Sequence, residues 1–209
     1  MRIKALLSCF CLAALAAGQA QAIGITDARG DYVPGFTGSK AGDLDVIGSF
    51  VTYNRANDTF VFSGTMDADI GTTPGGFYVW GVNKGAGTAG FAANGYGGIL
   101  FDAVVILNSN GTGRVGGVNL AAGSVLISGT TIMALVPGSL LPSTGFAKPA
   151  YTWNLWPRDP TLTGFAAISD FAPDNSNAPV TVLGAVPEPT TALLLAVGLA
   201  GLALRARQR

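Results

Sequence analysis

The segment 23–186 of this chain is poor in helix-favouring residues and rich in residues that favour turns and strands. It holds 27 of the chain's 30 glycines, no Glu and few Lys, whereas Thr, Val and Asn are frequent. Gly suits tight turns and weakens helices, and β-branched residues pack well on strands. The segment therefore favours an all-β fold of short strands joined by many turns.

Alternating apolar and polar side chains support this prediction. In Thr59–Met66, Phe60, Phe62 and Met66 share one face, which is typical of a half-buried strand. Leu44–Tyr53 is its predicted partner across the turn at 54–58. Further strands are expected at Phe77–Val82, Ile99–Leu107, Arg114–Leu120, Val125–Ser128, Thr131–Val136, Tyr151–Trp156 and Pro179–Leu183, with one helical turn at Pro137–Leu141. About nine strands predict an antiparallel β-sandwich, jelly-roll or immunoglobulin-like, whose core includes Phe60, Phe62, Val104 and Ile106.

The first 22 residues have the pattern of a secretory signal peptide. Arg2 and Lys4 precede an apolar run from Ala5 to Ala17, and Ala20-Gln21-Ala22 is a small-x-small cleavage site. The run is too short to span a bilayer comfortably. Because both cysteines, Cys9 and Cys11, lie in this segment, the exported chain is expected to have no thiol.

The C-terminal end has three parts in a fixed order. A stalk at 184–189 contains Pro187-Glu188-Pro189, residues 190–204 carry no charge, and residues 205–209 include three arginines. As a helix the uncharged stretch would be about 22 Å long, enough to span a bilayer with snorkelling arginines. We therefore expect an exported domain at 23–183, a single transmembrane helix at 190–204 and a cytoplasmic tail at 205–209.

This order resembles the PEP-CTERM sorting signal of exported proteins from Gram-negative bacteria that make exopolysaccharide. The residues that carry the resemblance are Pro187, Glu188, Pro189, Arg205, Arg207 and Arg209. The resemblance implies an exosortase, a membrane enzyme similar to a transpeptidase, as a partner. It also implies a single-pass inner-membrane form before processing and a destination at the cell surface or in the extracellular matrix.

Two pairs of aspartates suggest a weak calcium site. Asp43 and Asp45 are two residues apart, as are Asp67 and Asp69, so on a strand each pair would point to one face. Carboxylate oxygens are ligands that Ca²⁺ prefers. The alternative is that these are solvated aspartates at strand ends, and no other cofactor is expected.

The stretch around two tryptophans offers a candidate glycan contact. Trp153 and Trp156 are three residues apart, so on a straight strand they face opposite ways, and one is expected to be in the core and the other more exposed. Tyr96, in a glycine-rich loop, could join the exposed one in a sugar-stacking platform. Arg158 is expected to pair with Asp170 or Asp174.

Residue content excludes several function classes. The chain has no His, and its single Glu is Glu188, so Ser-His, Cys-His and His-metal sites are excluded from the exported domain. That domain has 7 basic and 11 acidic residues, which argues against nucleic-acid binding. The sequence thus predicts a non-enzymatic surface or matrix protein, associated with exopolysaccharide or biofilm through the membrane-anchored tail. The alternatives are a carbohydrate-binding module and, with less support, an Asp-based glycan hydrolase.

Overall fold

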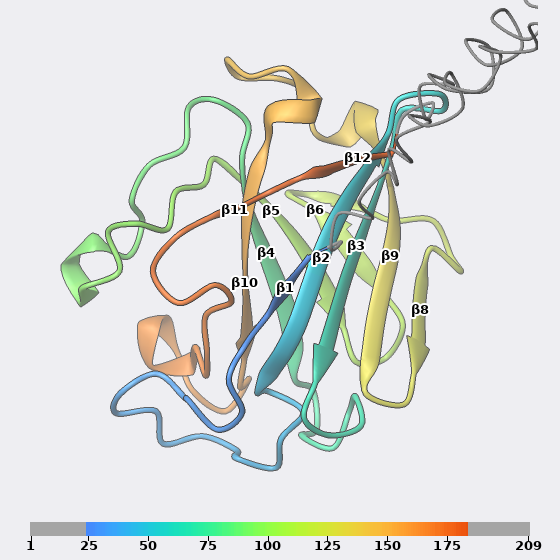
Figure 1. The fold of residues 1–209 in the computed structure, drawn as a ribbon. Coiled ribbons are helices and arrows are strands. Elements are labelled where there is room, and N and C mark those ends of the chain that lie inside the picture. Colours follow the sequence, from blue (N-terminus) through green and yellow to red (C-terminus); the bar gives the residue numbers. More distant parts are fainter. Residues whose placement is uncertain (1–23, 184–209) are drawn as a thin grey trace, which may run out of the picture.

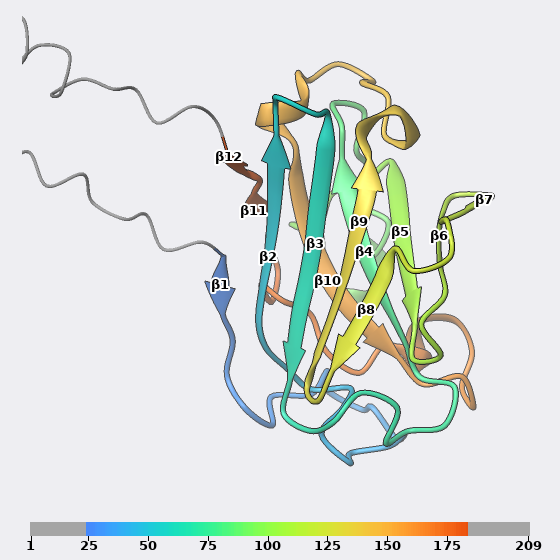
Figure 2. The same ribbon diagram turned by 90° about the vertical axis from the view of Figure 1, so that its right-hand side faces the viewer.

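The computed structural model describes residues 24–183, which form two six-stranded β-sheets packed face to face (Figures 1 and 2). All pairings between its strands are antiparallel except one, between β12 and β2. Within these residues no helix is long and apolar enough to cross a membrane. The predicted signal peptide, stalk, transmembrane helix and arginine tail lie outside the described range.

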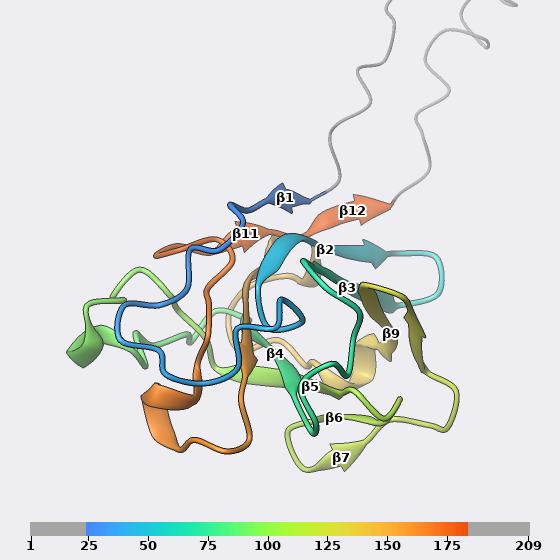
Figure 3. The same cartoon turned by 90° about the horizontal axis from the view of Figure 1, so that it is seen from below.

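The first sheet has the order β1-β2-β3-β9-β8, and β12 also pairs with β2. Its strands are β1 (Ile25–Thr26), β2 (Val46–Asn54), β3 (Thr59–Met66), β8 (Val125–Ser128), β9 (Thr131–Pro137) and β12 (Thr181–Leu183). Since β1 pairs with Gly48 and Ser49 and β12 pairs with 52–54, the first and last described strands share one edge of β2. Figure 3 shows both strands on that side.

The second sheet has the order β11-β10-β4-β5-β6-β7. Its strands are β4 (Phe77–Asn83), β5 (Ala103–Asn108), β6 (Gly113–Val115), β7 (Val118–Asn119), β10 (Thr152–Arg158) and β11 (Ala178–Pro179). Single 3₁₀ turns lie at η1 (Ala92–Asn94), η2 (Gly138–Leu140), η3 (Lys148–Ala150) and η4 (Gly164–Ala167). The turn η2 confirms the helical turn predicted at 137–141.

The all-β, antiparallel prediction is confirmed, with differences in detail. The described residues contain twelve strands rather than about nine. The strand predicted at 114–120 is a tight hairpin of β6 and β7, because Gly116 has a φ of 54° and reverses the chain. The strand predicted at 99–107 begins only at Ala103. The jelly-roll and immunoglobulin-like alternatives stay predictions.

The core between the sheets is aromatic. Phe60 and Phe62 of β3 are fully buried, as predicted. Phe60 stacks on Tyr151 with ring centres 5.8 Å apart, and Phe62 meets the edge of Trp80 on β4 at 6.0 Å. The indole of Trp80 donates a hydrogen bond to Ser49 Oγ at 3.2 Å, so its polar atom is satisfied inside the core.

The placement of Val104 and Ile106 in this core is wrong. On β5 it is Val105 and Leu107 that point between the sheets, and both are fully buried. Val104 and Ile106 lie on the opposite face of the second sheet, where they pack against a separate apolar cluster. An unbroken apolar run does not reveal which face of a strand is inside when both faces are covered.

That outer face is covered by loops rather than by solvent. The loops from 85 to 102 and from 159 to 177 lie beside the second sheet (Figure 1) and supply most of this second cluster. Its buried members are Val33, Val79, Ile99, Trp156, Ile168 and Phe171. The domain therefore has two apolar cores, one on each side of the second sheet.

Candidate functional site

The four aspartates of the predicted calcium site do not form one group. Asp43 is fully buried, and its carboxylate accepts hydrogen bonds from Thr73 N at 2.7 Å and from Thr73 Oγ1 at 2.6 Å. Asp69 is exposed in the turn after β3. Asp43 and Asp45 precede β2, and Asp67 and Asp69 follow β3, so the alternation of a strand does not apply to either pair.

Two of the four, Asp45 and Asp67, are joined by a backbone hydrogen bond. Asp67 N donates to the carbonyl oxygen of Asp45 at 2.9 Å, and the Asp67 carboxylate pairs with Arg29 at 2.6 Å. The Asp45 carboxylate is 1 % exposed and accepts a hydrogen bond from Gly30 N at 2.7 Å. Calcium binding by this set of four stays a prediction.

The structure assembles a different carboxylate group, at the end of the sandwich where β2 begins. Asp27 and Asp31, in the loop after β1, meet Asp170 from the loop after η4, with carboxylate oxygens all within 4.8 Å of one another. These two loops lie side by side in Figures 1 and 3. No sequence pattern links the three residues, because 139 positions separate Asp31 from Asp170.

The charge states of this group are strongly perturbed. Burial, followed by the charges of Asp31 and Asp174, raises the pKa of Asp27 to about 7. Burial is also the main reason that the pKa of Asp170 is raised to about 8, with the charges of Asp27 and Asp31 adding to it. The pKa of Asp31 is raised as well, mainly by burial. Without a counter-ion, the group resists carrying three negative charges.

Arg158 does not supply that counter-ion, so its predicted pairing with Asp170 or Asp174 is wrong. The guanidinium donates to the carbonyl oxygen of Gly164 at 2.7 Å instead, and it lies over the ring of Phe77. Asp170 accepts from two backbone amides, Val46 N at 2.9 Å and Phe171 N at 2.7 Å. These bonds fix the Asp170 side chain between the start of β2 and its own loop.

The two tryptophans face opposite ways as expected, but both are buried. Trp153 belongs to the core between the sheets and Trp156, 2 % exposed, to the second cluster. The expectation that one of them is more exposed is wrong, because the loops cover the outer face of β10. Tyr96 packs on Phe171 with ring centres 4.6 Å apart. The described structure thus shows no open ring face at either tryptophan, and their glycan-contact role stays a prediction.

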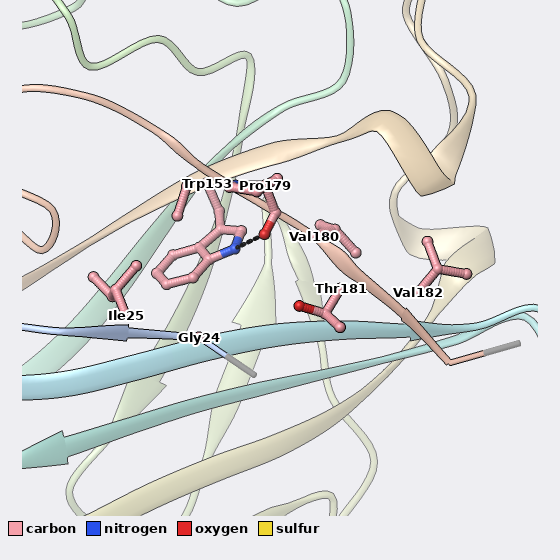
Figure 4. Close-up of a pocket in the computed structure, with 8 residues that line it drawn as sticks. Gly24, Ile25, Trp153, Pro179, Val180, Thr181 and Val182 are labelled. Carbon is pink, nitrogen blue, oxygen red and sulfur yellow. Dashed lines mark hydrogen bonds between the residues drawn. The ribbon is translucent and has the colours of Figure 1, made fainter. Parts of the chain in front are cut away.

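A pocket of about 470 Å³ lies at the edge of β2, between β1 and the chain of β11 and β12 (Figure 4). Gly24, Ile25 and residues 178–182 line it, with Trp153 at its base. The indole nitrogen of Trp153 donates to Pro179 O at 3.1 Å. Because the Trp153 side chain is fully buried, the pocket has no exposed aromatic platform for a sugar.

The described chain ends at Leu183 on β12, directly before the predicted sorting tail. Residues 185–208 match the PEP-CTERM protein-sorting motif. This match includes Pro187, Glu188, Pro189, Arg205 and Arg207, and Arg209 follows it by one position. The resemblance seen in the sequence is therefore confirmed.

The PEP-CTERM motif supports an exported protein that passes through the membrane and is sorted by an exosortase, as is typical of Gram-negative bacteria. It covers the tail only. No curated protein and no solved structure matches the chain.

Proposed function

We propose that this chain is a non-enzymatic surface or matrix protein whose β-sandwich is delivered by exosortase processing into the extracellular polysaccharide layer. The observation that carries the proposal is the position of the sorting motif. The last strand, β12, ends at Leu183, and the motif begins at residue 185. Processing within the motif would therefore release the whole folded domain and leave both sheets intact.

The amino-acid content supports a non-enzymatic role. The exported domain has no His, Cys or Glu, so catalysis would depend on Asp, Lys or Tyr. Carboxyl groups in glycosidases are separated by about 5–9.5 Å. In the Asp27, Asp31 and Asp170 group, one oxygen of each carboxylate lies within 4.8 Å of the chosen oxygens of the other two, which is closer than that range. The Asp-based hydrolase has less support for this reason.

The carbohydrate-binding alternative has less support than a matrix role as well. Sugar-binding sites commonly stack an exposed aromatic ring on the sugar, and both Trp153 and Trp156 are buried. Association with polysaccharide would then come from retention in the matrix rather than from a dedicated aromatic site.

The test is replacement of Pro187, Glu188 and Pro189 by Ala in the producing cell. The prolines keep this stretch extended, which suits capture in an enzyme cleft. We expect the variant to be exported and inserted normally but not processed, so that the full-length form accumulates in the membrane fraction on immunoblots. Release at the parental level would contradict exosortase sorting.

Two controls separate recognition from anchoring. Replacement of Arg205, Arg207 and Arg209 by Ala should disturb membrane insertion instead of recognition, since cationic residues hold the C-terminus in the cytoplasm. Deletion of the exosortase should reproduce the phenotype of the Pro-Glu-Pro variant in the parental chain.

Purified released protein incubated with the host's exopolysaccharide should generate no new reducing ends, and their appearance would contradict the non-enzymatic role.

A further inference from the structure

We propose that the loops at the end of the sandwich where β2 begins form a calcium site, with Asp27, Asp31 and Asp170 as ligands and the buried Asp45 as a supporting carboxylate. This site differs from the one predicted from aspartate spacing and shares only Asp45 with it. It requires export into a calcium-containing medium but does not depend on the matrix role.

The geometry of the three carboxylates suits one Ca²⁺ ion. Calcium binds carboxylate oxygens at about 2.4 Å, so two oxygens on one ion can be at most about 4.8 Å apart. Oxygens of Asp27, Asp31 and Asp170 all lie within 4.8 Å of one another. The Asp170 side chain is held by the amides of Val46 and Phe171, so its position is set before any ion arrives.

Asp45 gives an independent reason to place a cation here. It is 99 % buried, and its Oδ1 atom is shielded from solvent without a hydrogen-bond partner. Its Oδ2 atom accepts from Gly30 N at 2.7 Å, which holds the carboxylate against the loop that carries Asp27 and Asp31. A buried carboxylate oxygen without a partner is strongly unfavourable in its charged form unless a cation compensates it, and without a cation such a group tends to take up a proton instead.

Other oxygens of the group have the same need. Asp27 Oδ2 and Asp31 Oδ1 are also shielded from solvent and have no hydrogen-bond donor. Three carboxylates of the connection between β1 and β2, Asp27, Asp31 and Asp45, thus each present an unpaired oxygen at this end of the domain. A divalent ion supplies more compensation than any single side chain.

Several basic side chains of the described residues contact other groups. Arg29 pairs with Asp67 at 2.6 Å, Lys148 pairs with Asp58 at 2.7 Å, and Lys40 lies 5.3 Å from the ring centre of Tyr32. An all-oxygen set without His or Cys matches Ca²⁺ and disfavours zinc or copper. Calcium is preferred over Mg²⁺ because Mg²⁺ demands near-ideal octahedral geometry and loses its water reluctantly.

The first test is direct binding to the purified full chain in detergent after removal of metals by chelation. Tb³⁺, which replaces Ca²⁺ at oxygen sites, should give luminescence when Tyr32 near the site is excited. We expect saturable binding of one ion, displaced by Ca²⁺ with a dissociation constant of about 10⁻⁴–10⁻³ M, as in extracellular calcium modules. Saturating Ca²⁺ should raise Tm by about 5–10 °C over the chelated chain.

Paired variants assign the site. Asp27→Asn and Asp31→Asn, both near the surface, should each weaken Ca²⁺ binding about tenfold or more, since affinity follows the number of charged ligands. Asp69→Asn, an exposed aspartate outside the group, is the matched control and should bind like the parent. Near-ultraviolet circular dichroism should show that all three variants keep their packed cores.

Three results would overturn the proposal. The first is no saturable binding up to about 10 mM Ca²⁺, a concentration above the weakest extracellular sites. The second is unchanged binding in both the Asp27 and the Asp31 variants. The third is an equal response to Mg²⁺ at the same concentration, which would reject calcium as the ligand.

Discussion

At the scale of single residues, Asp159 shows how this domain uses a buried carboxylate without a metal. It is 2 % exposed and follows β10. Its Oδ2 accepts from Ser39 N at 2.7 Å, and its Oδ1 accepts from Thr161 N at 2.8 Å and Thr161 Oγ1 at 2.6 Å. Burial raises the pKa of Asp159, but these hydrogen bonds outweigh burial and hold the pKa below its ordinary value.

We predict that Asp159→Asn destabilises the domain by about 1–3 kcal/mol at pH 7. The substitution removes the charge and replaces one accepting oxygen with an NH₂ group, which cannot accept a hydrogen bond from the backbone N–H groups that face it. A lowered pKa stabilises the folded state above the unfolded value of about 3.9, and this contribution is lost as the pH falls through the folded pKa. The difference between parent and variant should therefore shrink below about pH 4. Urea denaturation followed by tryptophan fluorescence at pH 7 and pH 3 measures it. A difference that stays constant with pH would refute the charge-based role.

At the scale of elements, the burial of each face could be predicted for strands with one buried face, but not for strands that are covered on both faces. β3 and β8 have the predicted bounds, because alternating or turn-bounded segments fix them. The inward face of β5 and the exposure expected for one tryptophan of β10 were misjudged, since loops far away in sequence cover the outside of the second sheet. That layer explains why Val104 and Ile106 pack outward and why Trp156 is buried.

The outer layer depends on a close approach at Gly81 of β4. A Cβ added there would lie 2.5 Å from Trp156 Cζ3, because the indole lies directly over this residue. We predict that Gly81→Ala lowers the free energy of unfolding by about 1–3 kcal/mol through overpacking. Gly117→Ala, whose added Cβ meets nothing within 4 Å, is the control and should change it by less than about 0.5 kcal/mol. Equal denaturation midpoints for the two variants would count against the second core.

The acidic group could not be predicted from the sequence for a related reason. Spacing rules apply within one element, whereas Asp27 and Asp170 come from loops that only the folded sheets bring together. The pairs at 43–45 and 67–69 satisfied the spacing rule but lie before β2 and after β3. The sorting motif, by contrast, could be predicted from the sequence because its parts are local and follow one another along the chain.

At the scale of the whole molecule, the acidic group and Leu183, the last described residue before the sorting motif, lie at opposite ends of β2. Asp45 precedes its first residue, and Leu183 of β12 pairs with its last, Asn54. With nine residues in β2, each rising about 3.3 Å, the two ends are roughly 26 Å apart. Figure 1 shows β12 at the upper end of β2 and the acidic loops at the lower end.

This separation predicts that the two functions are independent. Asp31→Asn should be exported and processed at the parental rate, although it weakens calcium binding. The Pro-Glu-Pro variant should bind calcium like the parent once purified, because distant sites usually contribute additively. Immunoblots of processing and Tb³⁺ titrations of both variants check this. Loss of processing in the stable, folded Asp31 variant would reveal coupling between the two ends.

The attachment of β12 also has a mechanical consequence. Any load drawn through the C-terminal tail reaches Leu183 first, and β12 is held by only three paired positions on β2. Release of β11 and β12, residues 178–183, would move the attachment point of the tail back along the chain and free roughly 20 Å of chain at about 3.3–3.6 Å per residue. Most of the aromatic core would still be enclosed by the remaining strands of both sheets, which include β2, β3 and β9 of the first and β4, β5 and β10 of the second. Under tension the last two strands would thus detach before the rest of the domain unfolds.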